Sequence, residues 1–224
     1  MNGALENGAA QTSLHYVSTS TVEGTTTTIV GDVNRTSGSQ TIVVTYKKQK
    51  ATIAIELVGH EAYFRGDATA IEVLVGLTAP VSALAAGRWV SVVPADHVYN
   101  STAAALTVGS VLSEITLKPP LTGGRRAVVG NRTLAEIAGA WVGDGVTAKE
   151  HATALLEVTG GASSLPVRFS GVTPGSAAAP RFVESIVLSR WGEPVKVAPP
   201  SSSTPLSVIA GEAAPTTTQP PTVV

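Results

Sequence analysis

The chain contains no cysteine among its 224 residues. This absence excludes disulfide bonds, thiolate metal sites and cysteine nucleophiles. Aromatic residues are scarce, at 4%, so the 43% of hydrophobic residues must form a core mainly of Val, Ile, Leu and Ala. Charged residues make up only 14%, and no basic stripe stands out. Because phosphate binding needs clustered Lys and Arg, nucleic acid is not expected as a partner.

Long apolar runs are also missing. No stretch of about 20 apolar residues could cross a membrane as a helix. The first six residues are neither basic nor continuously apolar, so they do not form a signal peptide. If the protein is exported, we expect its targeting segment to have been removed from this sequence.

What is present is Thr, Ser, Gly and Val, which favour half-buried strands and short turns. Residues 12–65 read as consecutive β-hairpins, residues 66–115 carry helical spacing, and residues 122–198 return to strands. We therefore expect residues 1–198 to form a single domain.

The end of the chain, residues 199–224, differs in composition. It is rich in Pro, Ser and Thr, which predicts a largely disordered tail. Leu206-Ser207-Val208-Ile209 is the stretch within it that could form a last short strand. A Pro/Thr tail is also typical of a spacer or stalk, so a structural or protein-interaction module remains an alternative.

The apolar spacing of the first region predicts strand register. A two-residue turn at Lys48-Gln49 would place Val44 opposite Ile53. The same register would place Ile42 opposite Ile55, so all four side chains share one face. A single-residue slip would turn that face over.

A second turn extends this face to a third strand. With the turn at Gly59-His60, Phe64 lies opposite Ile55 and Ala62 lies opposite Leu57. Tight turns at both places therefore predict a three-stranded antiparallel sheet with one apolar face.

The period then changes from two to that of a helix. Ile71, Leu74 and Val75 fall at helical spacing, and Thr69 with Glu72 fits a capping box. Pro80 is expected to break or restart this helix.

A second helix is predicted further on, ended by Pro119-Pro120. Its apolar positions are Leu106, Val108, Val111, Leu112 and Ile115. Arg88–Val92 between the two helices predicts a short strand.

The last region predicts more strands, at Thr147–Thr159, Leu165–Ser170 and Arg181–Trp191, with a turn at Gly143-Asp144-Gly145. Two helices within an antiparallel run must lie on one face of the sheet. The predicted class is therefore α+β.

Four segments together resemble a known family. They are Tyr63–Ile71, Ala86–Val92, Leu106–Val108 and Leu188–Val197, the last reading LSRWGEPVKV. In sequence, order and spacing they are similar to the actinobacterial envelope lipoproteins typified by LppX and LprG. The resemblance covers roughly residues 12–198. It implies a fold like that of the lipoprotein carrier LolA: a strongly curved antiparallel half-barrel with helices packed on its concave face.

The resemblance also implies a function. Family members carry lipids or lipoglycans through the cell envelope, outside the cytoplasm, with the acyl chains in an apolar cavity. They are anchored to the membrane by a lipidated cysteine near the mature N-terminus. This chain departs from the pattern because it has no cysteine. We expect an acylated lipid as the partner, membrane contact through an anchor missing from this sequence, and a monomer.

The candidate cargo-contacting residues are apolar side chains of the predicted sheet face and helices. They are Ile42, Val44, Ile53, Ile55, Leu57, Phe64, Ile71, Leu74, Val75 and Leu112. Without the resemblance, the same residues would be interpreted as a dry core.

No motif for enzymatic chemistry stands out. The four histidines are scattered, and His60-Glu61 lacks the second histidine of a zinc-protease helix because Phe64 stands there. Neither a nucleophile elbow nor a phosphate-binding loop occurs. We therefore expect no enzyme activity, no metal and no cofactor. The volume of an apolar cavity would distinguish a carrier from an interaction module.

Overall fold

The computed structural model describes residues 2–129, 132–141, 152–175 and 180–213. The described strands form one twelve-stranded sheet in the order β12-β6-β5-β4-β3-β2-β1-β11-β10-β9-β8-β7. Its strands are β1 (Ser13–Val22), β2 (Thr25–Asn34), β3 (Gly38–Tyr46), β4 (Gln49–Val58), β5 (Glu61–Gly66), β6 (Val90–Val92), β7 (Leu117–Val129), β8 (Arg132–Trp141), β9 (Thr153–Thr159), β10 (Pro166–Thr173), β11 (Phe182–Ser189) and β12 (Thr204–Pro205). Neighbouring strands are antiparallel except for β12 and β6, which are parallel.

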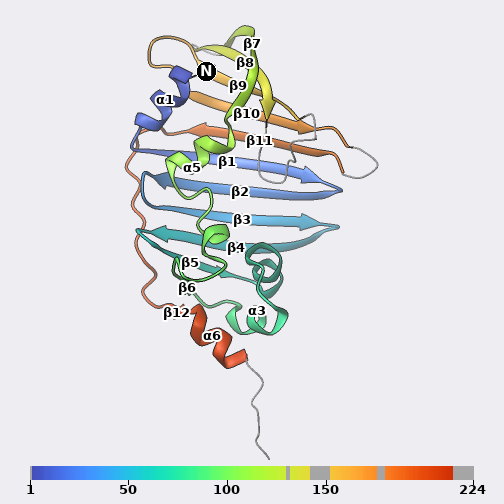
Figure 1. Cartoon of the computed structure of the whole chain (residues 1–224), viewed down its shortest axis with the longest axis vertical. Coiled ribbons are helices and arrows are strands. Elements are labelled where there is room, and N and C mark those ends of the chain that lie inside the picture. Colours follow the sequence, from blue (N-terminus) through green and yellow to red (C-terminus); the bar gives the residue numbers. More distant parts are fainter. Residues whose placement is uncertain (1, 130–131, 142–151, 176–179, 214–224) are drawn as a thin grey trace, which may run out of the picture.

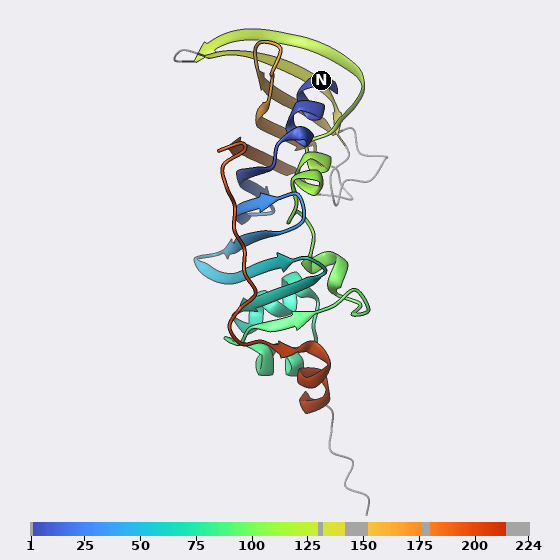
Figure 2. The same ribbon diagram turned by 90° about the vertical axis from the view of Figure 1, so that its left-hand side faces the viewer.

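The helices pack on one face of this sheet, which we call the helical face; the other is the open face (Figures 1 and 2). They are α1 (Asn2–Ala10), α2 (Ala68–Ala70), the π-helical turn η1 (Ile71–Val75), α3 (Ala79–Ala85), α4 (Tyr99–Thr102), α5 (Val108–Glu114) and α6 (Leu206–Ala213). The sheet is curled and does not close (Figure 2). The predicted α+β fold with a curved, half-barrel antiparallel sheet is confirmed.

The register of the first hairpin differs from the predicted one. The turn lies at Lys47-Lys48, so Ile42 pairs with Ile53. Both turn residues have positive φ angles, 44° and 71°. The offset is two residues, and side chains alternate with a period of two, so the predicted face is kept although the predicted partners are wrong.

The second hairpin follows the prediction. Ile55 pairs with Phe64, and Leu57 pairs with Ala62. Here the turn contains Gly59, whose φ of 64° is readily adopted by glycine because it has no Cβ.

The first helix begins differently from the prediction. The predicted Thr69/Glu72 capping box is wrong, because Asp67 is the N-cap and accepts a hydrogen bond from the Ala70 backbone N–H at 2.9 Å. The helix continues as η1 and ends at Gly76, which has a φ of 82°. Pro80 stands in the first turn of α3, so the predicted restart is confirmed.

The second helix is shorter than predicted. It ends at Glu114, and Pro119-Pro120 lies inside β7 and does not terminate the helix. Strands β6, β10 and β11 occupy predicted positions, while the predicted turn at 143–145 lies outside the described residues. Helix α1 was not predicted, because its sequence has no apolar stripe at helical spacing.

The C-terminal region corrects another prediction. Residues 206–209 belong to helix α6 and do not form a strand, and Leu206 and Ile209 are buried. The segment Arg190–Ser203, which we call the strap, joins β11 to β12 past the ends of the intervening strands (Figures 1 and 2). Its contacts include the Gly192 N–H to the Ser13 carbonyl at 3.0 Å and the Asn34 amide to the Val195 carbonyl at 3.3 Å. The strap therefore contacts β1 and β2 on its way from β11 to β12.

The core divides into two clusters. The first, the aromatic half, lies under α1 and α5 and contains Tyr16, Trp141 and Phe169. The second, the aliphatic half, lies under α2, η1, α3 and α6, and Phe64 is the one aromatic ring among its buried members. Both clusters lie on the helical face, side by side along the sheet.

Candidate functional site

A pocket opens at one end of the aliphatic half, between the β3–β4 hairpin and the helical segment α2–η1. Its volume is about 560 Å³, within the range of small-molecule sites. It is lined by Val44, Tyr46, Gln49, Lys50, Ala51, Thr69, Ala70, Val73 and Leu74. Most of these side chains are apolar. Of the polar ones, Gln49 and Lys50 stand at the hairpin end and Thr69 stands on α2.

Small residues open this space. Ala51 pairs with Val44 across the hairpin, and Ala70 faces them from α2. Asp67 fixes the distance between the two walls, since its second carboxylate oxygen accepts a hydrogen bond from the Thr52 backbone N–H at 2.6 Å. One aspartate therefore holds both the start of the helix and the hairpin end of β4.

Two walls of the pocket expose apolar side chains. Val73 on η1 is 67% exposed, and Tyr46 at the end of β3 is 44% exposed. A π-helical turn such as η1 is uncommon and often occurs at functional sites. In this turn Val73 points outward while Ile71 and Val75 are buried.

The predicted cargo residues lie in two places. Nine of the ten belong to the aliphatic half; they are Ile42, Val44, Ile53, Ile55, Leu57, Phe64, Ile71, Leu74 and Val75. Of these, Val44 and Leu74 line the pocket. Leu112 lies in the aromatic half. That any of them contacts a ligand stays a prediction.

Ala51, Ala70 and Val73 line the pocket but are not among the predicted cargo residues. A turn placed at Lys47-Lys48 would have put Ala51 opposite Val44 and left space at that position. The exposed position of Val73 did have a signal: the helical spacing of Ile71, Leu74 and Val75 leaves Val73 on the outward side of the helix.

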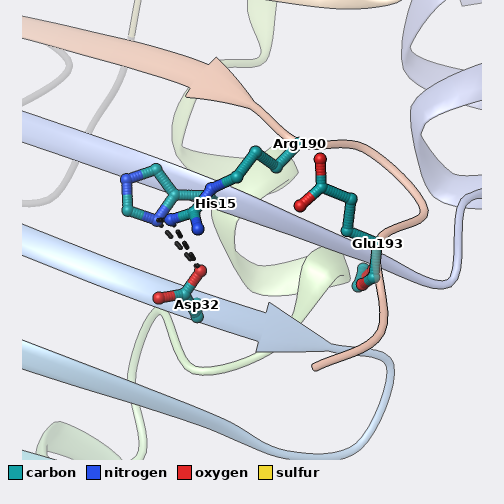
Figure 3. Close-up of polar contacts among 5 residues, drawn as sticks. His15, Asp32, Arg190 and Glu193 are labelled. Carbon is teal, nitrogen blue, oxygen red and sulfur yellow. Dashed lines mark hydrogen bonds and ion pairs between the residues drawn. The ribbon is translucent and has the colours of Figure 1, made fainter. Parts of the chain in front are cut away.

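A second polar arrangement lies on the open face (Figure 3). His15 and Asp32 are cross-strand partners, with Nδ1 of His15 2.9 Å from Oδ1 of Asp32. Arg190 donates to the same oxygen at 3.2 Å and also contacts the His15 ring. The Glu193 backbone carbonyl accepts a hydrogen bond from the Ser13 hydroxyl. These contacts attach the first residues of the strap to β1 and β2.

Two ionisable groups on the open face are perturbed. Burial raises the pKa of Glu56, whose Oε2 is buried and has no hydrogen-bond partner. Burial, the hydrogen bond to Glu61 and the nearby carboxylates raise the pKa of Tyr63 to about 12. Both groups lie on the opposite side of the sheet from the pocket, because Glu56 and Tyr63 are paired neighbours of Ile55 and Phe64.

Within the described ranges, no group of three His, Asp or Glu side chains could hold a metal ion. None of the helices described there is long and apolar enough to cross a membrane.

No family model matches the sequence. No curated protein matches it either. The structure is similar to the crystal structure of LprF from Mycobacterium bovis, with a TM-score of 0.55 and 15% identity, covering 90% of this chain and 95% of that one. An uncharacterised conserved protein from Thermus thermophilus matches with a TM-score of 0.43 and 7% identity, over 91% of this chain and 94% of that one. The likeness to LprF confirms the fold that the sequence resemblance implied.

Proposed function

We propose that this protein binds the acyl chains of a lipid or lipoglycan between its sheet and the α2–η1 segment, outside the cytoplasm, without covalent chemistry. The observation that carries the proposal is the largely apolar pocket of about 560 Å³ at the end of the aliphatic half. The LprF-like fold and the segments that resemble the LppX and LprG lipoproteins support the same function.

The composition of the aliphatic half suits a flexible apolar ligand. Leu74 and Val44 line the pocket and pack against the buried cluster that contains Ile71 and Val75. Each buried methylene contributes about 0.8 kcal/mol, so an acyl chain needs no charged contact to bind tightly. Aliphatic side chains also repack with less cost than aromatic rings held by hydrogen bonds.

A specific observation supports the alternative, an interaction module of the cell envelope without cargo. Ile53, Phe64 and Ile71 are fully buried, so the inner part of the aliphatic half is closed as it stands. In the proposed function, an acyl chain enters at the pocket and displaces η1 from this core. In the alternative, the core stays closed.

The test is titration of the purified protein with a fluorescent fatty acid kept below its micellar concentration. We expect saturable binding by the wild-type protein. Ala51→Trp should fill the pocket and weaken binding by about 10-fold or more, because Ala51 lines its sheet wall.

Ala54→Trp is the matched control. Ala54 lies on the same strand but on the open face, opposite Thr41 and Arg65. It should bind as the wild type does. No saturable binding by the wild type would favour the interaction module. Equal affinities for the two tryptophan variants would contradict the proposed site, because the fatty acid would then bind outside this pocket.

A further inference from the structure

The residues at the mouth of the pocket carry a pattern that the acyl-chain site does not require. We define the rim as Tyr46, Lys47, Lys48, Lys50 and Val73. The chain has six lysines, and three of them stand within this hairpin end. All five rim residues are exposed.

The rim combines positive charge with apolar side chains. Lys47 places its Nζ 5.0 Å from the centre of the Tyr46 ring, and Val73 is exposed on the opposite lip of the pocket. No acidic residue occurs between Thr41 and Ile55, so the hairpin end carries three positive charges and no negative one. The chain as a whole has a formal net charge of -1.

Acidic residues do occur on the neighbouring elements. Glu23 stands in the turn between β1 and β2 at the same end of the sheet, and Glu72 is exposed on η1. Asp67 already accepts hydrogen bonds from two backbone N–H groups. The lysines therefore project from the hairpin, and the acids belong to the elements beside it.

This end of the sheet is left uncovered by the strap, which passes the opposite strand ends near Ser13 and Asn34 (Figure 1). Lysines attract anionic headgroups, and tyrosine prefers the membrane interface. An exposed valine can insert at the boundary between the headgroups and the acyl chains. These are the properties of a surface that lies on an anionic bilayer.

We propose that the rim docks the protein on the surface of an anionic lipid bilayer, with the pocket mouth facing the membrane. This inference rests on the proposed function, because docking gives acyl chains a direct path into the pocket. It adds a contact made by the folded domain itself, separate from any anchor.

The test is flotation of the full chain with vesicles of phosphatidylcholine mixed with phosphatidylglycerol, and with phosphatidylcholine alone. We expect binding only to the mixed vesicles, and weaker binding as salt rises. The variant K47Q/K48Q/K50Q should lose about 5-fold in affinity for each lysine, on the order of 100-fold in total. Lys47 and Lys48 have positive φ angles, and glutamine at these positions adds no new backbone strain.

The matched control is K118Q/R168Q/K196Q, which removes three exposed cations elsewhere and leaves the same net charge. It should bind the mixed vesicles as the wild type does. The apolar contribution of the rim is tested with Val73→Ser, which should weaken binding to the mixed vesicles by about 5-fold. Val128→Ser, at a valine that is 74% exposed on β7, should not.

Equal binding of the wild type to both kinds of vesicle would overturn the inference, and so would equal losses in the two triple variants. The inference would also be wrong if the protein bound an acidic protein in a salt-sensitive way but did not bind vesicles. Uptake of the fluorescent fatty acid is measured without vesicles. If the protein takes up the fatty acid but does not bind vesicles, only the docking inference is wrong. If it binds vesicles through the rim but takes up no fatty acid, only the proposed carrier function is wrong.

Discussion

The two halves of the core share one sheet but are built from different side chains. In the aromatic half, the Trp141 and Phe169 rings meet edge to face with centroids 5.2 Å apart, and Trp141 stacks on Phe182 at 5.9 Å. Gly171 is needed beneath this group, since a Cβ there would lie 2.6 Å from Trp141 Cε3. The aliphatic half has Phe64 alone among its buried rings and opens into the pocket.

Polar atoms also separate the halves. The Trp141 indole donates a hydrogen bond to the Glu114 carbonyl at 2.9 Å, and the Tyr16 hydroxyl lies 2.6 Å from the Gln40 side-chain oxygen. Such bonds fix the orientation of large rings. The buried members of the aliphatic half are Ile, Leu, Val and Ala with Phe64, and their side chains have no hydrogen-bonding groups. The proposed function assigns different tasks to the two halves: the aromatic half maintains the fold, and the aliphatic half adapts to a ligand.

The largest expected effect is that of Trp141→Ala. Removing this ring, which is 2% exposed, should lower the free energy of unfolding by about 3–5 kcal/mol, measured by denaturant unfolding. Added fatty acid should not restore the loss, because the new cavity lies in the aromatic half, away from the pocket.

Ile53→Ala is the counterpart in the aliphatic half. Ile53 is fully buried and follows the pocket residue Ala51 on the same face of β4. The variant should lose about 2–4 kcal/mol, and fatty acid should restore part of that by filling space continuous with the pocket. Equal recovery in both variants would remove the distinction between the halves.

A smaller effect is expected for Asp67→Ala, which removes the N-cap of α2 and the bond to Thr52. Loss of a cap costs about 1–2 kcal/mol. The exchange of amide hydrogens in Ile71–Val75 should become faster, while exchange in α5 stays unchanged. Asp67→Asn keeps one oxygen acceptor, so its loss of stability should lie between those of the wild type and Asp67→Ala. Uniform acceleration across the chain would mean that the two halves unfold together.

The smallest effects on stability at neutral pH are expected from replacing two buried tyrosines, Tyr16 and Tyr63. Burial, and then the charges of Glu114 and Asp32, raise the pKa of Tyr16; the pKa of Tyr63 is raised to about 12. Since the folded values exceed the ordinary 10.0, stability is full below pH 10 and falls as pH rises toward the folded values. Tyr16→Phe and Tyr63→Phe should each reduce that fall, measured by unfolding at several alkaline pH values. An unchanged fall in both variants would assign it to other groups.

Several parts of the fold could be predicted because they depend on neighbouring residues. The face shared by Ile53, Ile55 and Phe64 follows from strand alternation, and it survived an error of two residues in the register. The restart of a helix at Pro80 follows from the missing N–H of proline. The N-cap was assigned to Thr69, because both residue types fit; the hydrogen bond from the Ala70 N–H identifies Asp67 as the N-cap.

The sequence by itself determined the class of fold, the apolar face and the aliphatic character of the core, since these depend on alternation, helical period and composition. Only the tertiary structure decided where the pocket opens and which residues form its rim. Tyr46 and Val73 are 27 positions apart in the chain, and they line the same pocket because the hairpin and η1 pack at the same end of the sheet. Helix α6 is likewise formed in a region of tail-like composition, where burial of Leu206 and Ile209 supplies stability that local propensity does not.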